Sequence, residues 1–389
     1  MLEQGLDDET FALFISELRR FVRQVLVPAE KQMVAEDRIP EDVLKQMREM
    51  GLFGLTIPPE YGGAGLKISQ YVETIQELSW ASPAFRAIIS INTGMICSAL
   101  MNFGTQEQRE TWLPRLAAGD VSSFALTEPD SGSDSAGLRT RAERDGDCYV
   151  LNGTKRYITN APSASVILVM ARTSQQNLPK NAHVSAFLVP TDIPGVSIGT
   201  PDKKMGQTGA HIADVVLDNV RVPLSALVGE EGGGFKAAME SLDIGRLTVA
   251  AGSCGYAKRI LDAGLRYATE RKAFGEVIAN FQLIQAMLAD SKTEIYAADC
   301  MIRDACARAD KGERVSQEAS CAKMFASEMC GRVADRVVQI HGGAGYLQEY
   351  DAERFYRDVR IYRIYEGTTQ ILQLSIAKGM LRSFVAGDD

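Results

Sequence analysis

The sequence has few of the residues that bind metals or form disulfides. Its three histidines are far apart, and none stands at metal-ligand spacing from another histidine or from a cysteine. We therefore expect no metal site. The seven cysteines are odd in number and scattered, and none forms a C-x-x-C pair. This pattern is typical of reduced thiols in an intracellular protein rather than of a disulfide framework.

The sequence also lacks an excess of basic residues. It has 42 Lys and Arg against 50 Asp and Glu, a formal net charge of −8 and a pI near 5.2. This balance argues against a nucleic-acid-binding surface, but it leaves room for a phosphorylated ligand in a local pocket. The first residues, MLEQGLDDETF, are acidic and do not form a signal peptide, and no apolar run reaches about 18 residues. We expect a cytoplasmic protein without membrane insertion.

The composition is that of an ordinary globular protein. Hydrophobic residues make up 46% and charged residues 24% of the 389 residues, which is enough chain for more than one domain.

The hydrophobic period changes twice along the chain. Residues 1–120 show helical spacing, residues 121–233 show short β-rich runs between Gly, Pro, Asn and Asp, and residues 234–389 show long helical stripes. These ranges predict a helical domain, a β-sandwich or barrel domain and a helical bundle. Within CYVLNGTKRYIT, Asn152-Gly153 predicts the turn of a β-hairpin.

Three segments are candidates for function, and each also has a plain structural interpretation. TEPDSGSD (127–134) fits a loop against a phosphate or flavin, or an ordinary surface turn. QIHGGAG (339–345) fits close backbone approach to a cofactor, or a glycine-rich helix end. Glu366, between Tyr365 and Gly367, fits a catalytic carboxylate or a charge at a helix N-terminus. No G-x-G-x-x-G follows a strand, so a nicotinamide-binding fold has no support.

Five separated motifs occur in an order that resembles the acyl-CoA dehydrogenase family: TEPDSGSD, KRYITN, ERKAFG, QIHGGAGY and IYEGTTQI. The resemblance covers almost the whole chain and is nearest the short-chain and short-branched-chain branch. It implies an N-terminal α-helical domain, a middle β-barrel or sandwich domain and a C-terminal four-helix bundle. It also implies bound FAD, an acyl-CoA substrate, a homotetramer, and an electron-transfer flavoprotein as electron acceptor.

The same resemblance implies roles for particular residues. Thr127, Ser133, Tyr157 and Thr159 stand at positions that contact the flavin or its pyrophosphate in the family. Thr368 and Gln370 stand at positions of a further FAD contact. In the family, another set of positions binds the adenine end of the FAD held by a neighbouring subunit. The residues at these positions here are Arg271, Phe274, Gln282, Gln339, Gly342 and Gly343. Substrate contacts match Ser133, Asp243, Arg246 and Gly367.

The catalytic base of the commonest branch matches Glu366. Some members carry this base on another helix, where this chain has Gly245, which cannot serve. The implied reaction is FAD-dependent α,β-dehydrogenation of an acyl-CoA thioester to the trans-2-enoyl-CoA. The sequence departs from the family pattern at two places in the flavin site. Asp130-Ser131 stands where Gly-Ala is common, and Tyr157 stands where tryptophan is frequent.

Two other kinds of function remain open from the sequence. One is a flavoenzyme of the same fold with different chemistry, either an acyl-CoA oxidase or a flavin-dependent monooxygenase, although monooxygenases generally lack a base at the Glu366 position. The other is a non-enzymatic flavin-binding or DNA-associated protein. A basic patch or tail would indicate such a protein, but the last residues here, SFVAGDD, are acidic.

Overall fold

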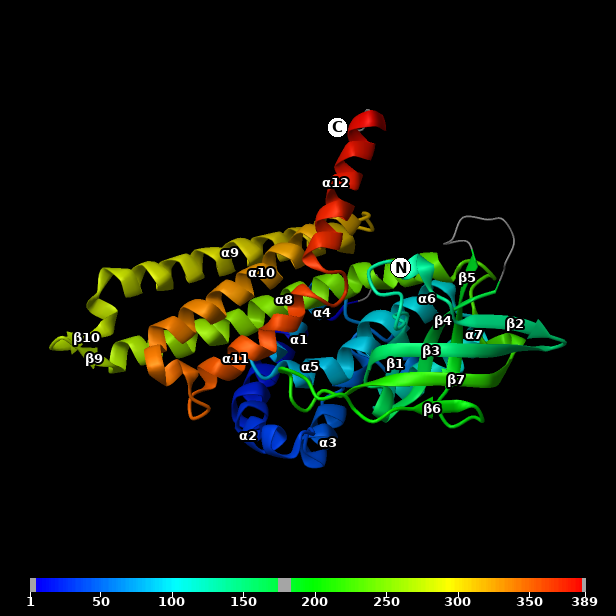
Figure 1. Cartoon of the computed structure of the whole chain (residues 1–389), viewed down its shortest axis with the longest axis horizontal. Helices are drawn as coiled ribbons and strands as arrows, with labels where there is room; N and C mark the ends of the chain where they lie inside the picture. The colour runs from blue at the N-terminus through cyan, green and yellow to red at the C-terminus, as the bar shows by residue number, and fades with distance from the viewer. Residues whose placement is uncertain (1–4, 174–182, 387–389) are drawn as a thin grey trace.

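The computed structural model describes residues 5–173 and 183–386, and these residues form helical, β and helical parts in that order (Figure 1). The predicted fold class is confirmed. The N-terminal part consists of α1 Asp8–Phe21, α2 Val27–Glu36, α3 Glu41–Glu49, α4 Ile68–Leu78, α5 Pro83–Ser90, α6 Cys97–Phe103 and α7 Gln106–Ala117.

The middle part is one mixed eight-stranded sheet. Its strands are β1 Val121–Ala125, β2 Arg141–Asp145, β3 Cys148–Thr159, β4 Ala164–Arg172, β5 Val184–Pro190, β6 Val196–Ile198, β7 Ile212–Pro223 and β8 Leu227–Val228. Seven of them follow the order β6-β7-β3-β2-β4-β5-β8, and β1 pairs in parallel with β4. β1 also contacts the helical stretch Ile91–Ile96, so it joins the sheet to the N-terminal helices.

The predicted hairpin at Asn152-Gly153 was wrong, because both residues lie inside the continuous strand β3. The turn comes earlier, at Gly146-Asp147, where Asp145 of β2 pairs with Cys148 of β3. Gly153 is needed for another reason: a Cβ there would lie 2.8 Å from the Cα of Thr140. The pairing of β3 with β7 shifts register at this glycine, so it marks a bulge rather than a turn.

The C-terminal part is built around one long helix. It contains α8 Gly234–Glu270, α9 Gln282–Asp310, α10 Ser316–His341, α11 Asp351–Val359 and α12 Thr369–Ala386, with the short strands β9 Lys272–Ala273 and β10 Glu276–Val277. The 37 residues of α8 span about 55 Å at the rise of an α-helix. α8, α9 and α10 pack together, and α12 projects from the bundle (Figure 1).

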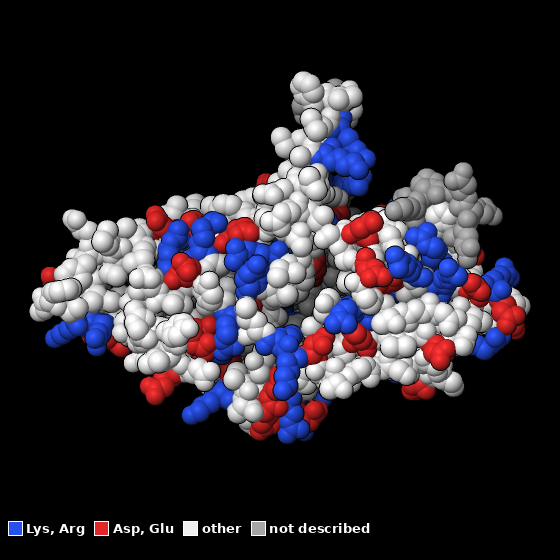
Figure 2. Space-filling view, in the orientation of Figure 1, with Lys and Arg blue, Asp and Glu red and all other residues white. Residues whose placement is uncertain are grey.

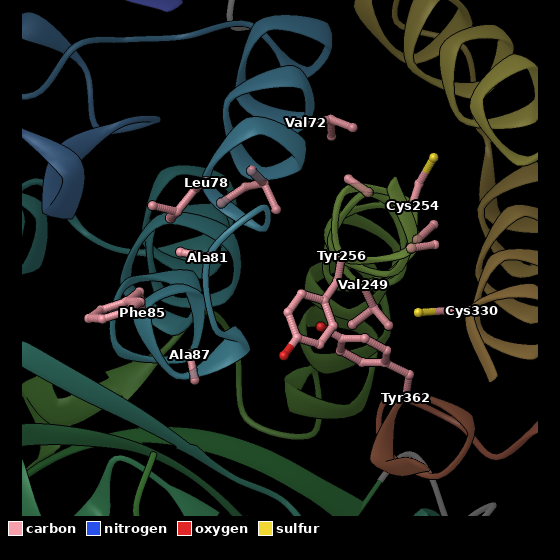
Figure 3. Packing of buried hydrophobic residues seen from close by; sticks show 14 of the residues in the cluster. Val72, Leu78, Ala81, Phe85, Ala87, Val249, Cys254, Tyr256, Cys330 and Tyr362 are labelled. Atoms are coloured by element: carbon pink, nitrogen blue, oxygen red, sulfur yellow. The ribbon is translucent and has the colours of Figure 1, made fainter. Parts of the chain in front are cut away.

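The N-terminal helices pack directly on α8. Val249 and Tyr256 of α8, Tyr362 and Phe85 of α5 belong to the same buried hydrophobic cluster (Figure 3). A buried ion cluster ties the same parts together, because Glu30 of α2 accepts hydrogen bonds from Arg259 of α8 and Arg354 of α11. A scaffold joined in this way holds the ends of the helices, and the residues on them, in fixed positions.

One helical stretch, Pro83–Phe103, has the length and mean hydropathy (1.4) of a membrane span among the described residues. In this structure 83% of its apolar window is buried inside the protein, as in the core helix of a soluble protein. The stretch also contains a charged residue, Arg86, which is itself buried.

Candidate active site

Glu366 lies on the short connection between the turn Arg360–Arg363 and α12. Its backbone is left-handed, with φ 52°, and that of Gly367 is left-handed as well, with φ 94°. Glycine adopts this conformation without cost, but a glutamate does not. Such conformations persist where the surrounding structure holds them, and they gather at functional sites.

The carboxylate of Glu366 rests against α8 at Gly245. A Cβ at position 245 would lie 2.1 Å from Oε2 and 2.9 Å from Cδ of Glu366, so only glycine leaves room for the carboxylate. Oε2 is buried and has no hydrogen-bond partner. A buried carboxylate oxygen without a hydrogen-bond partner destabilises a folded chain. This indicates that Oε2 accepts a hydrogen bond or a proton from a ligand.

Burial raises the pKa of Glu366, and the nearby cations Arg86, Lys323 and Arg246 lower it by less. Lys323 is fully buried in α10, and its Nζ donates to the Gly367 carbonyl at 2.7 Å. Burial lowers the pKa of Lys323 to about 8. A carboxylate with a raised pKa is a stronger proton acceptor near neutral pH than an ordinary surface glutamate.

Of the four predicted substrate contacts, three gather around the carboxylate. Nη1 of Arg246 donates to Asp243 Oδ1 at 2.7 Å on the same face of α8, and Arg246 interacts electrostatically with Glu366. Gly367 is joined to the group through Lys323. Ser133 lies elsewhere, exposed in the loop that follows β1.

The four predicted flavin contacts lie on β3 or on the loop after β1. The Thr127 carbonyl accepts from Arg156 N–H at 2.9 Å, which holds that loop beside β3, and Ser123 Oγ donates to the Thr159 carbonyl at 2.8 Å. Between them Tyr157 has φ 59° and is 56% exposed. A strained strand residue that presents an aromatic ring to the outside suits a ring system that stacks on it.

A buried ion pair anchors the loop that follows β1 to strand β3. Glu128 accepts from Lys155 Nζ at 2.8 Å and from the Thr140 N–H at 2.9 Å, and both charged side chains are almost fully buried. Lys155 also donates to the Leu126 carbonyl at 3.2 Å. The TEPDSGSD segment is therefore not an ordinary surface turn, because its second residue is a buried anchor.

The six residues predicted to bind an adenine end lie at the opposite end of α8. About 38 Å of helix separates Arg246 from Arg271. The β9–β10 hairpin and the end of α10 share a small apolar cluster there, which includes Ile278 and Ile340. Phe274 is 97% exposed with φ 52°. The remaining five, also exposed, are Arg271, Gln282, Gln339, Gly342 and Gly343.

Thr368 and Gln370 flank the start of α12. Thr368 Oγ1 accepts from the Ile371 N–H at 3.2 Å, as an N-capping residue does, and Gln370 is exposed. Within the described residues, no group of three or more His, Cys, Asp and Glu side chains is arranged to hold a metal ion.

Family models match three stretches in this order: the acyl-CoA dehydrogenase N-terminal domain over residues 8–120, the middle domain over 123–220 and the C-terminal domain over 232–381. The chain belongs to the acyl-CoA dehydrogenase family. It is therefore an FAD-dependent oxidoreductase.

Relatives of this acyl-CoA dehydrogenase match over nearly their whole length. Human mitochondrial short-chain specific acyl-CoA dehydrogenase is 38% identical, covering 97% of this chain and 91% of the relative. Subunit CarC of the caffeyl-CoA reductase-Etf complex of Acetobacterium woodii is 38% identical, covering 95% and 99%. The structure of butyryl-CoA dehydrogenase from Megasphaera elsdenii superposes with a TM-score of 0.92 at 32% identity, covering 97% and 99%.

The residues present fit an extended FAD. The exposed ring of Tyr157 offers a stacking surface, and no atom lies within 4 Å of a Cβ built on Gly342 or Gly343, so backbone is open to a ligand there. The two groups of matched residues lie at opposite ends of the molecule, one at β3 and the other around the β9–β10 hairpin (Figure 1).

Two functional candidates were missed from the sequence, Arg86 and Lys323. Each interrupts an apolar or small-residue helical stripe, FRAIISI and ASCAKMFAS respectively. A single charge inside such a stripe was the available signal, since Lys and Arg are almost never fully buried without a partner.

Proposed function

We propose that this acyl-CoA dehydrogenase oxidises the Cα–Cβ bond of an acyl-CoA thioester to the trans-2-enoyl-CoA, with Glu366 as the base that takes the α-proton. The observation that carries the proposal is the buried, unpartnered Oε2 of Glu366, held against Gly245. The raised pKa of this carboxyl fits a group that must accept a proton from a weak carbon acid.

The chain supplies positioning as well as a base. The left-handed backbone at Glu366 and Gly367, fixed by Lys323, sets the direction of the Glu366 N–H. In this proposal that N–H donates to the thioester oxygen, where negative charge develops as the α-proton leaves, and one such donor contributes about 3–4 kcal/mol. Bound FAD supplies the acceptor for the hydride that leaves Cβ.

We infer that the enzyme works as an oligomer, a homotetramer on the family pattern. The support is that the two groups of residues predicted to bind the cofactor lie at opposite ends of the molecule, one at β3 and the other at the β9–β10 hairpin (Figure 1). In an oligomer, a second copy would bring its hairpin with Phe274 to the Tyr157 of the first copy. A further support is α12, where exposed apolar side chains line one face and project from the body, largely uncharged except for Lys378 and Arg382 (Figures 1 and 2). These side chains are Leu374, Met380, Leu381, Phe384 and Val385.

We also propose an electron-transfer flavoprotein as the electron acceptor. The support is the relative CarC, which is a subunit of a complex with Etf. An oxidase of the same fold would instead release hydrogen peroxide in air, and this measurement separates the two.

The test of the proposed function is anaerobic titration of the purified, FAD-loaded protein with acyl-CoA thioesters of increasing length, with and without a terminal carboxylate. We expect at least one group of thioesters to bleach the oxidised flavin band, with one 2-enoyl-CoA formed per flavin reduced. A protein that binds FAD but is bleached by none of them would refute dehydrogenation of acyl-CoA.

A further inference from the structure

The segment that carries Glu366 has little hydrogen bonding of its own. It joins the turn Arg360–Arg363 to α12, and Glu366 and Gly367 both have left-handed backbone. Within the described residues, neither the Glu366 N–H nor the Gly367 N–H donates a hydrogen bond. A strained conformation without internal hydrogen bonds persists only where neighbouring elements hold it. The groups that hold this segment therefore decide where the base lies.

Helix α10 holds this segment on both sides of the base through one carboxylate. Glu328 Oε2 accepts from Arg363 Nη1 at 3.1 Å, and Glu328 Oε1 accepts from Thr369 Oγ1 at 2.7 Å. Thr369 is itself buried and is the first residue of α12. Glu328 therefore bridges the chain just before and just after Glu366, so that both ends of the strained segment are tied to the same helix.

Lys323 of α10 holds the same segment at its centre. Its side chain is fully buried, and its Nζ donates to the Gly367 carbonyl at 2.7 Å. Among the residues that the structure describes, Lys323 forms no ion pair, whereas the other fully buried lysine, Lys155, pairs with Glu128 at 2.8 Å. A buried ammonium whose partner is a carbonyl rather than a carboxylate destabilises the fold. Its retention indicates a task other than stability.

The Lys323 ammonium also acts on the charge of the base. Burial raises the pKa of Glu366, and Lys323, like Arg86 and Arg246, opposes this rise. The charged and titratable side chains that interact electrostatically with Glu366 are Arg86 of α5, Arg246 of α8, Lys323 of α10, Tyr71 of α4 and the adjacent Tyr365. Lys323 differs from the two arginines because it also donates to the backbone next to the base. Arg86 donates to the Tyr365 hydroxyl, and Arg246 donates to Asp243.

We propose that Lys323 and Glu328 are positioning residues for the base: together they hold the segment 363–369 on α10, so that the Glu366 carboxylate stays against Gly245 and the Glu366 N–H keeps its direction. The proposal rests on the proposed function, because it takes Glu366 as the group that accepts the α-proton. Neither residue touches the substrate, and each acts through the position of Glu366. Lys323 has a second effect, since its charge keeps Glu366 ionised to a lower pH than burial alone would allow.

The first measurement is hydrogen–deuterium exchange in the FAD-loaded protein without substrate. Lys323→Met and Glu328→Gln each weaken the hold on the segment, so the amides of residues 364–372 should exchange about tenfold faster than in wild type. Glu318→Gln is the matched control, because Glu318 lies on the same helix, pairs with Arg308 and has 27% of its side chain exposed, against 29% for Glu328. It should leave the exchange of this segment unchanged. Wild-type exchange in both test variants would refute the hold by α10.

The second measurement is the limiting rate of anaerobic flavin reduction by the acyl-CoA that bleaches the wild-type flavin fastest. A displaced base should lower this rate by about 100-fold in Lys323→Met. The decrease should be about tenfold in Glu328→Gln, which keeps an amide oxygen for Thr369. FAD content and the Kd of the corresponding 2-enoyl-CoA product should change by less than about threefold, since the loss concerns the reacting step. Glu328→Gln carries the test if Lys323→Met fails to fold, because Glu328 is partly exposed.

The pH dependence of the same rate distinguishes a positioning role from a purely structural one. Removal of the Lys323 cation raises the pKa of Glu366, so the acid limb of the rate should lie at higher pH in Lys323→Met than in wild type. Glu328 pairs with Arg363 and does not shift the pKa of Glu366. Glu328→Gln should therefore lower the rate but keep the wild-type acid limb.

The outcomes separate this proposal from the proposed function. If an acyl-CoA reduces the wild-type flavin but both variants keep the wild-type rate, or if the acid limb does not move in Lys323→Met, the positioning role is refuted and the dehydrogenase remains. If no thioester reduces the wild-type flavin, the proposed function fails and the positioning role fails with it, whatever the deuterium exchange shows.

Discussion

Gly245→Ala would place a methyl group where the Glu366 carboxylate lies. The added Cβ would be 2.1 Å from Oε2 and 2.9 Å from Cδ, with Met95 Cε 3.1 Å away on another side. Real Cβ atoms are almost never closer than 3.0 Å to another heavy atom. The carboxylate must therefore move by about 1 Å, because α8 is largely buried and packs against α10, α9 and α4, so its backbone cannot shift freely.

We expect Gly245→Ala to lower the rate strongly and to change the stability little. A misplacement of about 1 Å in a reacting group lowers the rate by about 100-fold. Replacing glycine by alanine inside a helix stabilises the fold by about 0.5–1 kcal/mol, apart from the cost of moving one side chain. We therefore expect kcat to fall by about two orders of magnitude with FAD bound and little loss of stability.

The assay is anaerobic stopped-flow reduction of the flavin, with denaturant unfolding of the same preparation. Gly331→Ala is the matched control: it lies inside α10, and its added Cβ would meet its nearest atom, in Arg363, at an ordinary 3.5 Å. It should keep the wild-type rate. A wild-type rate in Gly245→Ala would refute the position of the base against α8.

The remaining predictions concern stability and assembly. Lys155→Met should destabilise the protein by about 3–5 kcal/mol, because it leaves Glu128 buried without its cation; unfolding in urea with an unchanged midpoint would contradict this. Burial raises the pKa of Glu366 above 4.5 in the folded state, so stability falls as pH rises from the unfolded pKa to the folded pKa. Glu366→Gln should then be more stable than wild type at pH 7 and no more stable below pH 4, as measured by denaturant unfolding at both pH values. Phe384→Asp on α12 should shift the protein to smaller species by light scattering if α12 is buried between copies; an unchanged mass would remove α12 from the interface.

Much of the fold was predictable because each part has its own hydrophobic period. The helical stripes, the short β-rich runs and the long second set of stripes correspond to the three parts of the structure. The hairpin prediction at Asn152-Gly153 failed because strand pairing overrode a local turn signal. β3 continues through both residues while it pairs with β2 and β7, and Thr140 leaves no room for a side chain at Gly153.

The site was predictable only in part. Glu366 was assigned by its motif, but its contact with Gly245 joins residues 121 positions apart and could not be derived from spacing. Arg86 and Lys323 were missed since burial of a charge is a property of the folded chain. The glutamate of TEPDSGSD was assigned no role, because its partner Lys155 comes from another motif.

The most direct test of the central claim is the rate of anaerobic flavin reduction in Glu366→Gln. The glutamine keeps the shape of the side chain but cannot accept the α-proton. We expect FAD content and acyl-CoA binding close to wild type, with the reduction rate lower by about 10²–10⁴-fold, the usual contribution of a general base. A Glu366→Gln protein that reduces its flavin at the wild-type rate would contradict the assignment of Glu366 as the base.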